Sequence, residues 1–331
     1  MNFNNLLKKK TIIVAEIGNN HEGDFNIAKK LIDEAKKCGV DAVKFQTFEP
    51  DSFIYKKDKK RLKQIKKFQF SFEQFKKLSQ YTKKKNLIFL STPFDIKSAK
   101  FLNKIQDIFK ISSGDNTFYP LLKLVAGFNK TIILSTGLIN YKEIKNTVRF
   151  INNIWKKKKH NNKKLILLHC VSSYPVKDKD ANLKSITFLK NNMKKNIIGY
   201  SDHTIGINAA IGSVCLGARV IEKHFTLDNK YSKFRDHELS LNPKDMKKLV
   251  AEIKKTESQM GHYEKKIGKE EKKNINATRR SIGASKAIKK NKKINLEDLI
   301  WVRSSKGLKP GEEKKILKKS KKNYQVGDLL R

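Results

Sequence analysis

The sequence predicts an α/β fold built on an eight-stranded (β/α)8 TIM barrel. Short apolar runs rich in β-branched residues alternate with amphipathic helical patterns, and the alternation repeats eight times. An open doubly wound sheet is the competing arrangement, but no GxGxxG sequence follows the first predicted strand. The chain of 331 residues is long enough for a closed barrel and a small second domain.

The predicted strands are separated by stretches in which apolar residues recur at helical spacing, such as FNIAKKLIDEAKKCG and FEQFKKLSQYTKKKN. A last helix, from about residue 242 to 261, would complete the barrel. In chain order the predicted strands are Thr11 to Gly18, Asp41 to Phe48, Leu87 to Phe94, Ile108 to Asp115, Thr131 to Leu138, Lys164 to Tyr174, Asn196 to His203 and Arg219 to Thr226.

The pattern changes towards the C-terminus, and it predicts three segments. Residues 1–262 form the barrel domain. Residues 263–276 are polar and rich in Lys and Glu, which is typical of a linker. Residues 277–331 alternate short strand patterns with turns and predict a small, mostly β domain. A unit of that size is marginally stable alone, so we expect it to pack on a partner surface.

Charge and composition indicate a cytoplasmic protein without a specific nucleic-acid partner. The net charge of +42 comes almost entirely from Lys residues spread along the chain, and only eight Arg residues are present. A nucleic-acid site would be expected to concentrate its charge and to use Arg. Neither a membrane span nor a secretory signal is evident. Cys38, Cys170 and Cys215 are predicted to be reduced packing residues.

Polar side chains gather at the C-terminal ends of the predicted strands, where β/α barrels carry their active sites. Lys44 and Lys110 each interrupt an apolar run, although an unpaired buried ammonium is costly. With nearby hydroxyls, they predict a site for a phosphate and a carboxylate. The strand-end residues are Glu16, Lys44, Gln46, Thr92, Lys110, Ser112, Ser113, Asp115, Ser135, Thr136, His169, Ser172, Tyr174, Ser201, Asp202, His203, Glu222 and His224.

Two histidines predict a metal centre. His203 and His224 end the neighbouring strands seven and eight, so both imidazoles could reach one ion. With no Cys expected nearby and several carboxylates present, the pair favours an open site for manganese or magnesium. Two separate structural histidines are the alternative. His21 could be a ligand, a substrate contact or a loop-stabilising residue, and His169 is expected to pack inside the barrel.

The motifs together resemble the sialic acid synthase family. AEIGNNHEGD, VKFQTF, STPFD, FKISSGD, ILSTG, LLHCVSSYP, GYSDHT and EKHFT follow one another at consecutive strand ends. The tail, with RRSIGASKAIKK and VRSSKG, resembles the antifreeze-like (SAF) domain of these enzymes. The resemblance covers roughly residues 11 to 331.

The resemblance implies condensation of phosphoenolpyruvate with an open-chain N-acylated amino sugar to give a nonulosonic (sialic) acid. Phosphate would leave after water attacks the enol ether carbon. The site would use a divalent metal, Mn²⁺ or alternatively Mg²⁺ or Co²⁺. The implied binding residues are Lys44, Thr92, Lys110, Ser113, Ser135 and Ser201 for phosphoenolpyruvate, His203 and His224 for the metal, Glu16 at the reacting centre, Gln46, Tyr174 and Asp236 for the sugar, and Arg303 for its N-acyl group.

Family resemblance also implies a homodimer in which each C-terminal domain closes the partner's barrel. Three departures from the family pattern concern the sugar side: Asp115 replaces a Glu, Ser172 replaces an Asn, and RSSKG replaces RPGTG. The Lys-rich loop at 55–70 has no matched counterpart. The substrate is therefore open between N-acetylmannosamine and a related 2,4-diacetamido-trideoxyhexose, the substrate type of legionaminate and pseudaminate synthases.

Other functions remain open on the sequence alone. A lyase or isomerase on the same barrel would need neither the appended domain nor the phosphoenolpyruvate lysines. A basic anion- or nucleic-acid-binding protein without enzymatic activity predicts strong, salt-sensitive affinity. A synthase-like chain that has lost its activity is a further alternative.

Overall fold

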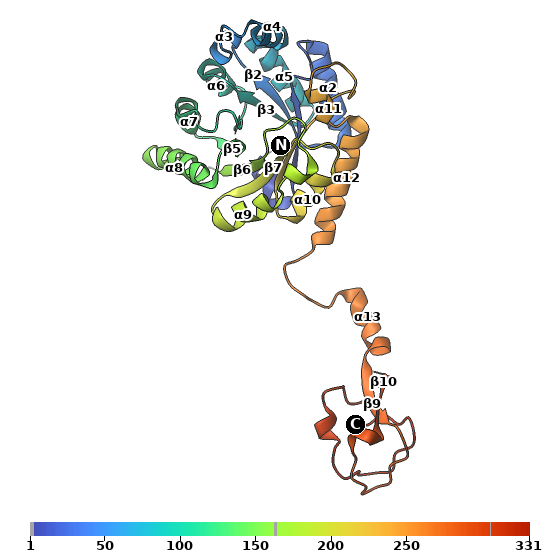
Figure 1. The fold of residues 1–331 in the computed structure, drawn as a ribbon. Helices are drawn as coiled ribbons and strands as arrows, with labels where there is room; N and C mark the ends of the chain where they lie inside the picture. Colours follow the sequence, from blue (N-terminus) through green and yellow to red (C-terminus); the bar gives the residue numbers. More distant parts are fainter. Residues whose placement is uncertain (1–2, 162–163, 305) are drawn as a thin grey trace. The chain divides into compact units, whose positions relative to one another are not determined.

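A computed structural model describes residues 3–161, 164–304 and 306–331 and divides the chain into two compact units, Met1–Gly261 (unit 1) and His262–Arg331 (unit 2). Unit 1 is an α/β fold around one sheet of eight parallel strands (Figure 1). The strands follow the order β3-β2-β1-β8-β7-β6-β5-β4, and the two edge strands β3 and β4 also contact each other. This arrangement is the one expected of a TIM barrel.

All eight predicted strands are present, although several are shorter than the apolar patterns suggested. The predicted fourth and sixth strands end at Ile111 and Cys170, and the polar residues that follow them form turns and loops. The bounds are β1 Ile12–Gly18, β2 Ala42–Thr47, β3 Ile88–Pro93, β4 Ile108–Ile111, β5 Thr131–Ser135, β6 Leu165–Cys170, β7 Ile197–Asp202 and β8 Val220–His224.

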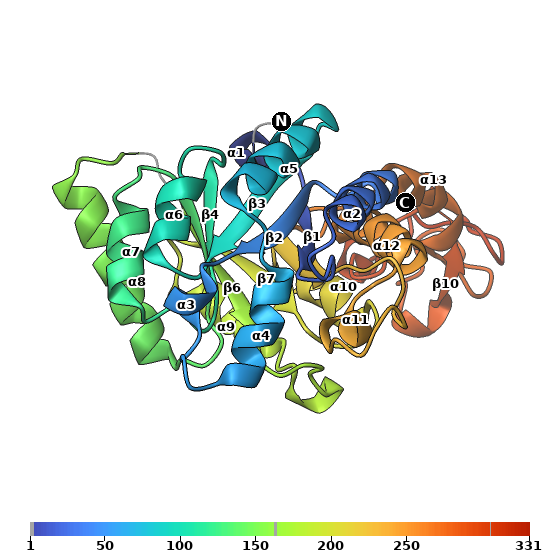
Figure 2. The same cartoon turned by 90° about the horizontal axis from the view of Figure 1, so that it is seen from above.

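Helices cover the outer side of the strands, and in two perpendicular views α6, α7 and α8 lie outside them (Figures 1 and 2). Several begin with side-chain caps, such as Asp24 before α2 and the capping box of Ser71 and Gln74 at α5. The helices are α2 Phe25–Cys38, α3 Pro50–Phe53, α4 Lys59–Phe68, α5 Phe72–Lys84, α6 Ile96–Leu102, α7 Tyr119–Ala126, α8 Tyr141–Lys157, α9 Lys184–Asn192, α10 Asn208–Cys215, α11 Asp236–Leu239 and α12 Pro243–Met260.

Two apolar clusters hold unit 1 together. The larger one lies between the strands and the surrounding helices. The smaller one consists mainly of strand residues, such as Val14 and Ile166, that alternate along each strand with those of the larger cluster. Helix α1, Phe3–Lys9, was not predicted, yet its Phe3 and Leu7 are buried in the smaller cluster. Among the described residues, no helix is both long and apolar enough to cross a membrane.

Two helices occupy segments that were predicted to be irregular. Helix α4 lies within the Lys-rich loop at 55–70, and α13, Lys269–Thr278, occupies much of the predicted linker. Unit 2 also contains β9, Arg280–Ala284, paired antiparallel with β10, Leu299–Arg303. The C-terminal stretch YQVGDLL, one of the short strand patterns of residues 277–331, forms isolated bridges to residues 283 and 288 instead of a strand. Unit 2 has its own small apolar cluster, which includes Ile282 and Tyr324.

Candidate active site

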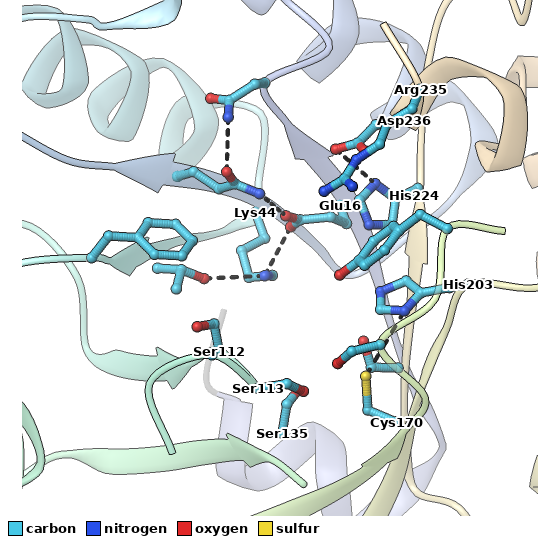
Figure 3. A pocket seen from close by; sticks show the side chains of 18 of the residues that line it. Glu16, Lys44, Ser112, Ser113, Ser135, Cys170, His203, His224, Arg235 and Asp236 are labelled. Carbon is cyan, nitrogen blue, oxygen red and sulfur yellow. Dashed lines mark hydrogen bonds and ion pairs between the residues drawn. The ribbon is translucent and has the colours of Figure 1, made fainter. Parts of the chain in front are cut away.

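A cavity of about 1030 Å³ opens at the C-terminal ends of the strands of unit 1 (Figure 3). Parallel strands present their C-terminal ends on the same side of a barrel, which is why residues far apart in sequence meet here. The predicted site residues that line it are Glu16, Lys44, Gln46, Thr92, Lys110, Ser113, Asp115, Ser135, Ser172, Tyr174, Ser201, His203, His224 and Asp236. Arg303 is an exposed residue of β10 in unit 2, and its contact with a sugar stays a prediction.

Two lysines and two glutamates form a buried ionic network in the cavity. The Lys44 ammonium lies 3.0 Å from a carboxylate oxygen of Glu16 and 3.4 Å from one of Glu222, and it donates to Thr92 Oγ1 at 3.1 Å. The Lys110 ammonium lies 3.2 Å from Glu222. All four ionic side chains are nearly inaccessible to solvent. The lysines that interrupt the apolar runs are thus paired, as the cost of a buried charge requires.

The same network moves the pKa values of its two carboxyl groups in opposite directions. Burial, only partly offset by Lys44, raises the pKa of Glu16 to about 7. Burial also disfavours the charge of Glu222, but Lys110, Lys44 and a hydrogen bond from Ser201 Oγ at 2.9 Å outweigh it and lower the pKa of that carboxyl. Glu222 therefore stays ionised, whereas Glu16 can exchange a proton near neutral pH.

Hydroxyl and amide groups complete the polar wall. Gln46 donates to Glu16 Oε1 at 3.3 Å and accepts from Asn19 at 2.8 Å, which fixes its amide next to the ionic network. Among the described residues, Ser135 Oγ and Ser172 Oγ have no hydrogen-bond partner. Asp115 accepts a short hydrogen bond from Ser112, so one of its oxygens is already engaged. Unpartnered hydroxyls in a cavity are free to bind ligand oxygens.

His203 and His224 lie side by side, with ring centroids 5.3 Å apart (Figure 3). His203 Nδ1 donates to the carbonyl oxygen of Val171 at 2.8 Å, which leaves Nε2 available. The Tyr174 ring packs on His203 at a centroid distance of 4.2 Å. His224 Nδ1 has no hydrogen-bond partner among the described residues and lies 4.0 Å from Asp236 Oδ2.

The donor set fits an open divalent-metal site. One imidazole is oriented by a hydrogen bond to a backbone carbonyl, which is typical of a metal ligand, and the other keeps an unpartnered buried nitrogen. Within the described residues no group of three or more His, Cys, Asp and Glu side chains is placed to hold an ion. The remaining ligands would have to be water and substrate oxygens.

The two other strand-end or loop histidines have structural surroundings. His21 is buried, stacks on Phe70 at 4.1 Å and accepts from the Gly23 amide at 3.0 Å. Burial lowers its pKa to about 3, so the ring is neutral. His21 does not line the cavity, and of its three predicted roles the structure supports loop stabilisation. His169 binds the carbonyl oxygen of Ala181 at 2.9 Å, which agrees with a packing role.

Several lining residues received no role from the sequence. Glu222 was noticed only as a strand-end residue, although its position two residues before His224 on one strand places both side chains on the same face. Arg235 also lines the cavity. Cys170 was predicted to be a packing residue away from the histidines, but it lines the cavity with its Sγ 3.9 Å from His203 Nδ1. Three further lining residues, Arg61, Gln64 and Ile65, come from α4, whose position could not be inferred without recognising the helix.

Comparison with known proteins decides the family, because residues 31–265 match the model of the NeuB family. The chain belongs to the NeuB family. It is 41% identical to the N,N'-diacetyllegionaminic acid synthase of Campylobacter jejuni over 338 residues, which cover 98% of this chain and 99% of that relative. It is 35% identical over 346 residues to the pseudaminic acid synthase of the same species, covering 100% of this chain and 97% of that relative.

A solved structure agrees with this assignment. The N-acetylneuraminic acid synthetase of Leptospira borgpetersenii, determined in complex with citrate, is 37% identical, superimposes with a TM-score of 0.75, and covers 81% of this chain and 90% of that one. The prediction of a sialic acid synthase-family enzyme, a phosphoenolpyruvate-dependent transferase, is therefore confirmed.

Proposed function

We propose that this NeuB-family enzyme condenses phosphoenolpyruvate with a 2,4-diacetamido-trideoxyhexose, in its open-chain form, to give a nonulosonic acid of the legionaminic type and phosphate. The observation that carries the reaction type is the composition of the cavity. Its lining combines two buried lysines, Lys44 and Lys110, with hydroxyl groups that lack hydrogen-bond partners among the described residues and with a pair of imidazoles. The near full-length similarity to a N,N'-diacetyllegionaminic acid synthase supports the sugar class.

The anionic substrate would bind at the lysine end of the cavity. The Lys44 ammonium already contacts Glu16, Glu222 and Thr92. The Lys110 ammonium has three donor protons and, among the described residues, is paired with Glu222, so it has protons left for a ligand. Thr92, Ser113, Ser135 and Ser201 add hydroxyl groups around the lysines. Because carboxylate and phosphate oxygens accept charge-assisted hydrogen bonds, this end suits both anionic groups of phosphoenolpyruvate.

The sugar would contact Gln46, Tyr174, Ser172, Asp115 and Asp236, which line the cavity. A divalent cation, Mn²⁺ or alternatively Mg²⁺ or Co²⁺, would be held by His203 and His224 and would supply Lewis-acid polarisation of the aldehyde. Tyr174 and Asp236 flank the imidazoles, so they would orient the aldehyde end of the sugar.

Glu16 is the group that would move a proton. The enol carbon of phosphoenolpyruvate forms the new bond to the aldehyde carbon as the aldehyde π bond breaks and its oxygen takes up a proton. Water then adds at the former enol ether carbon, and the C–O bond to phosphate breaks. Water must lose a proton in this step, and a buried carboxylate with a pKa of about 7 is a suitable base at neutral pH.

Unit 2 would have a separate role. We propose that it is the antifreeze-like domain of the family and that it closes the barrel of a partner subunit in a homodimer, with Arg303 directed at the N-acyl group. Its antiparallel pair of short strands supports a small β domain, and its small apolar cluster supports dependence on a partner surface. A cytoplasmic location, in the absence of nucleic-acid or membrane partners, is part of the same proposal.

Assay of phosphate release with a panel of amino sugars tests the function. We expect release only when phosphoenolpyruvate and the diacetamido-trideoxyhexose are both present, with slower turnover of N-acetylmannosamine, and we expect chelation to abolish it and Mn²⁺ to restore it. Release from phosphoenolpyruvate alone would indicate a hydrolase. Faster turnover of an unacylated pentose or heptose would contradict the sugar class.

A further inference from the structure

A fully buried ion pair is formed by the two residues that directly precede His203 and His224 in the sequence. Lys223 and Asp202 each expose none of their side chain, and the ammonium donates to Asp202 Oδ2 at 2.9 Å. Side chains alternate along a strand, so Lys223 points away from the face that carries Glu222 and His224. Neither residue lines the cavity. The proposed reaction gives this pair no task.

The pair connects strand β7 to strand β8 at the point where their backbone pairing ends. The register aligns Asp202 with Lys223, the last aligned residues of the two strands. His203 follows Asp202 immediately, and His224 follows Lys223 immediately. The pair therefore lies one residue before both histidines. Its side-chain contact links β7 to β8 at the point where their backbone pairing ends.

The same contacts fix the backbone on both sides of His203. Asp202 Oδ1 accepts from the Thr204 backbone amide and from Thr204 Oγ1, each at 2.8 Å. Lys223 Nζ donates to the Thr204 carbonyl oxygen as well as to Asp202. One ammonium thus binds the residue before and the residue after His203, which restricts the direction in which its imidazole leaves the backbone.

Burial of the Lys223 and Asp202 charges costs free energy unless both are fully paired and hydrogen-bonded. Removing a charge from water costs several kcal/mol per ion, and a well-packed apolar pair of similar volume would often be as stable. Stability alone therefore gives little reason for a Lys–Asp pair at this position. Precise placement of two neighbouring side chains does give one, because metal ligation tolerates little displacement of its ligands.

We propose that Lys223 and Asp202, through Thr204, are positioning residues that hold the imidazoles of His203 and His224 at the separation needed to share one divalent cation. The inference rests on the metal centre of the proposed function. Loss of the pair should weaken Mn²⁺ binding while leaving the lysine end of the cavity intact. It should also lower turnover at a given Mn²⁺ concentration.

Mn²⁺ binding to the full-length protein, followed by the electron paramagnetic resonance signal of free Mn²⁺, tests the proposal. The variant Lys223→Met/Asp202→Asn removes both charges together, so no unpaired buried ion remains. We expect its Mn²⁺ dissociation constant to rise about 10- to 100-fold. Affinity for phosphoenolpyruvate without metal, measured by calorimetry, should stay within about 2-fold of wild type, since Lys44 and Lys110 are unchanged.

A matched control distinguishes positioning from general support of the barrel. Lys10 and Asp41 form another ion pair with a buried carboxylate, which also accepts from the backbone amide of Ile13, but neither residue lines the cavity. The variant Lys10→Met/Asp41→Asn should keep the wild-type Mn²⁺ affinity. Thr204→Val, which loses one hydroxyl and little volume, should fold even if the double variant does not, and should weaken Mn²⁺ binding by a few-fold.

The outcomes separate this inference from the metal proposal. Wild-type Mn²⁺ affinity in folded Thr204→Val and Lys223→Met/Asp202→Asn proteins would overturn the positioning role and leave the metal centre standing. Equal weakening in the Lys10→Met/Asp41→Asn control would also overturn it, because the effect would then be a general consequence of a looser barrel. Absence of Mn²⁺ binding in the wild-type protein would contradict the metal centre and the positioning role together.

Discussion

Glu16 and Glu222 carry the same functional group in one cavity, yet their surroundings prepare them for different tasks. Glu222 contacts both lysines and accepts from Ser201, so its negative charge is well compensated. Glu16 contacts Lys44 alone among the two lysines, and burial dominates its pKa. Glu222 is therefore suited to hold the lysines in place, and Glu16 can exchange a proton near neutral pH.

The pKa of Glu16 predicts the pH dependence of the reaction. A raised pKa means that the folded protein holds the proton up to about pH 7, so the base form is lost as the pH falls through 7. We expect kcat/KM to fall below pH 7 and the inflection to vanish in Glu16→Gln, together with a loss of about 10²- to 10⁴-fold in kcat. Steady-state kinetics from pH 5.5 to about 9 measure this. An unchanged inflection in the variant would assign it to another group.

Glu222 predicts an effect on stability. Glu222→Gln leaves Lys110 buried without its carboxylate, which should cost about 3–5 kcal/mol in the free energy of unfolding. Denaturant unfolding near neutral pH measures the loss. The control is Glu270→Gln, which breaks the exposed pair with Lys273 and should cost less than about 1 kcal/mol. Similar losses in the two variants would show that the buried network contributes little.

At the scale of elements, the strands could be predicted because each is an apolar, β-branched run between helical patterns. The strand ends could be predicted less well, since the polar sequences after Ile111 and Cys170 continue the run but leave the sheet. Helix α4 was missed because its few apolar residues lie among lysines, and α13 because none of its residues is buried. Their helical pattern was hidden by charge.

The candidate site was predictable to a similar extent. Strand-end logic and family resemblance together selected residues that the barrel brings into one cavity. They did not select the α4 residues, because the position of a helix inserted after a strand depends on packing that no local pattern reveals. They also could not pair Lys223 with Asp202, since that contact joins two strands through side chains on their outer face.

Strand packing predicts the effect of one glycine. A Cβ added at Gly199 in β7 would lie 2.4 Å from the Val220 carbonyl oxygen and 2.5 Å from a methyl carbon of Leu168. A backbone oxygen cannot move away cheaply, so Gly199→Ala should destabilise unit 1 by about 1–3 kcal/mol. Gly268→Ala, where a Cβ meets nothing within 4 Å, is the control and should cost less than about 1 kcal/mol, because only a preferred N-cap residue of α13 is lost. Equal melting temperatures would contradict this description of the barrel.

At the scale of the whole molecule, the proposed exchange of C-terminal domains predicts complementation. His203→Ala damages the barrel and Arg303→Ala damages unit 2, so each homodimer should be inactive or nearly so. In a swapped heterodimer one site combines both defects, but the other has an intact barrel and an intact Arg303. Activity should therefore return when the two variants are mixed under conditions of subunit exchange. Verified exchange without activity would place Arg303 on its own barrel or outside the site.

The central claim is that the enzyme joins phosphoenolpyruvate to an amino-sugar aldehyde in the cavity of unit 1 and releases phosphate after water adds at carbon. Turnover in ¹⁸O-labelled water tests this claim most directly. The enzyme is incubated with Mn²⁺, phosphoenolpyruvate and the diacetamido-trideoxyhexose, and both products are analysed by mass spectrometry. We expect unlabelled phosphate, because the C–O bond and not the P–O bond breaks, and a nonulosonic acid that carries ¹⁸O at the former enol ether carbon. Labelled phosphate, or phosphate formed without the sugar, would contradict the account.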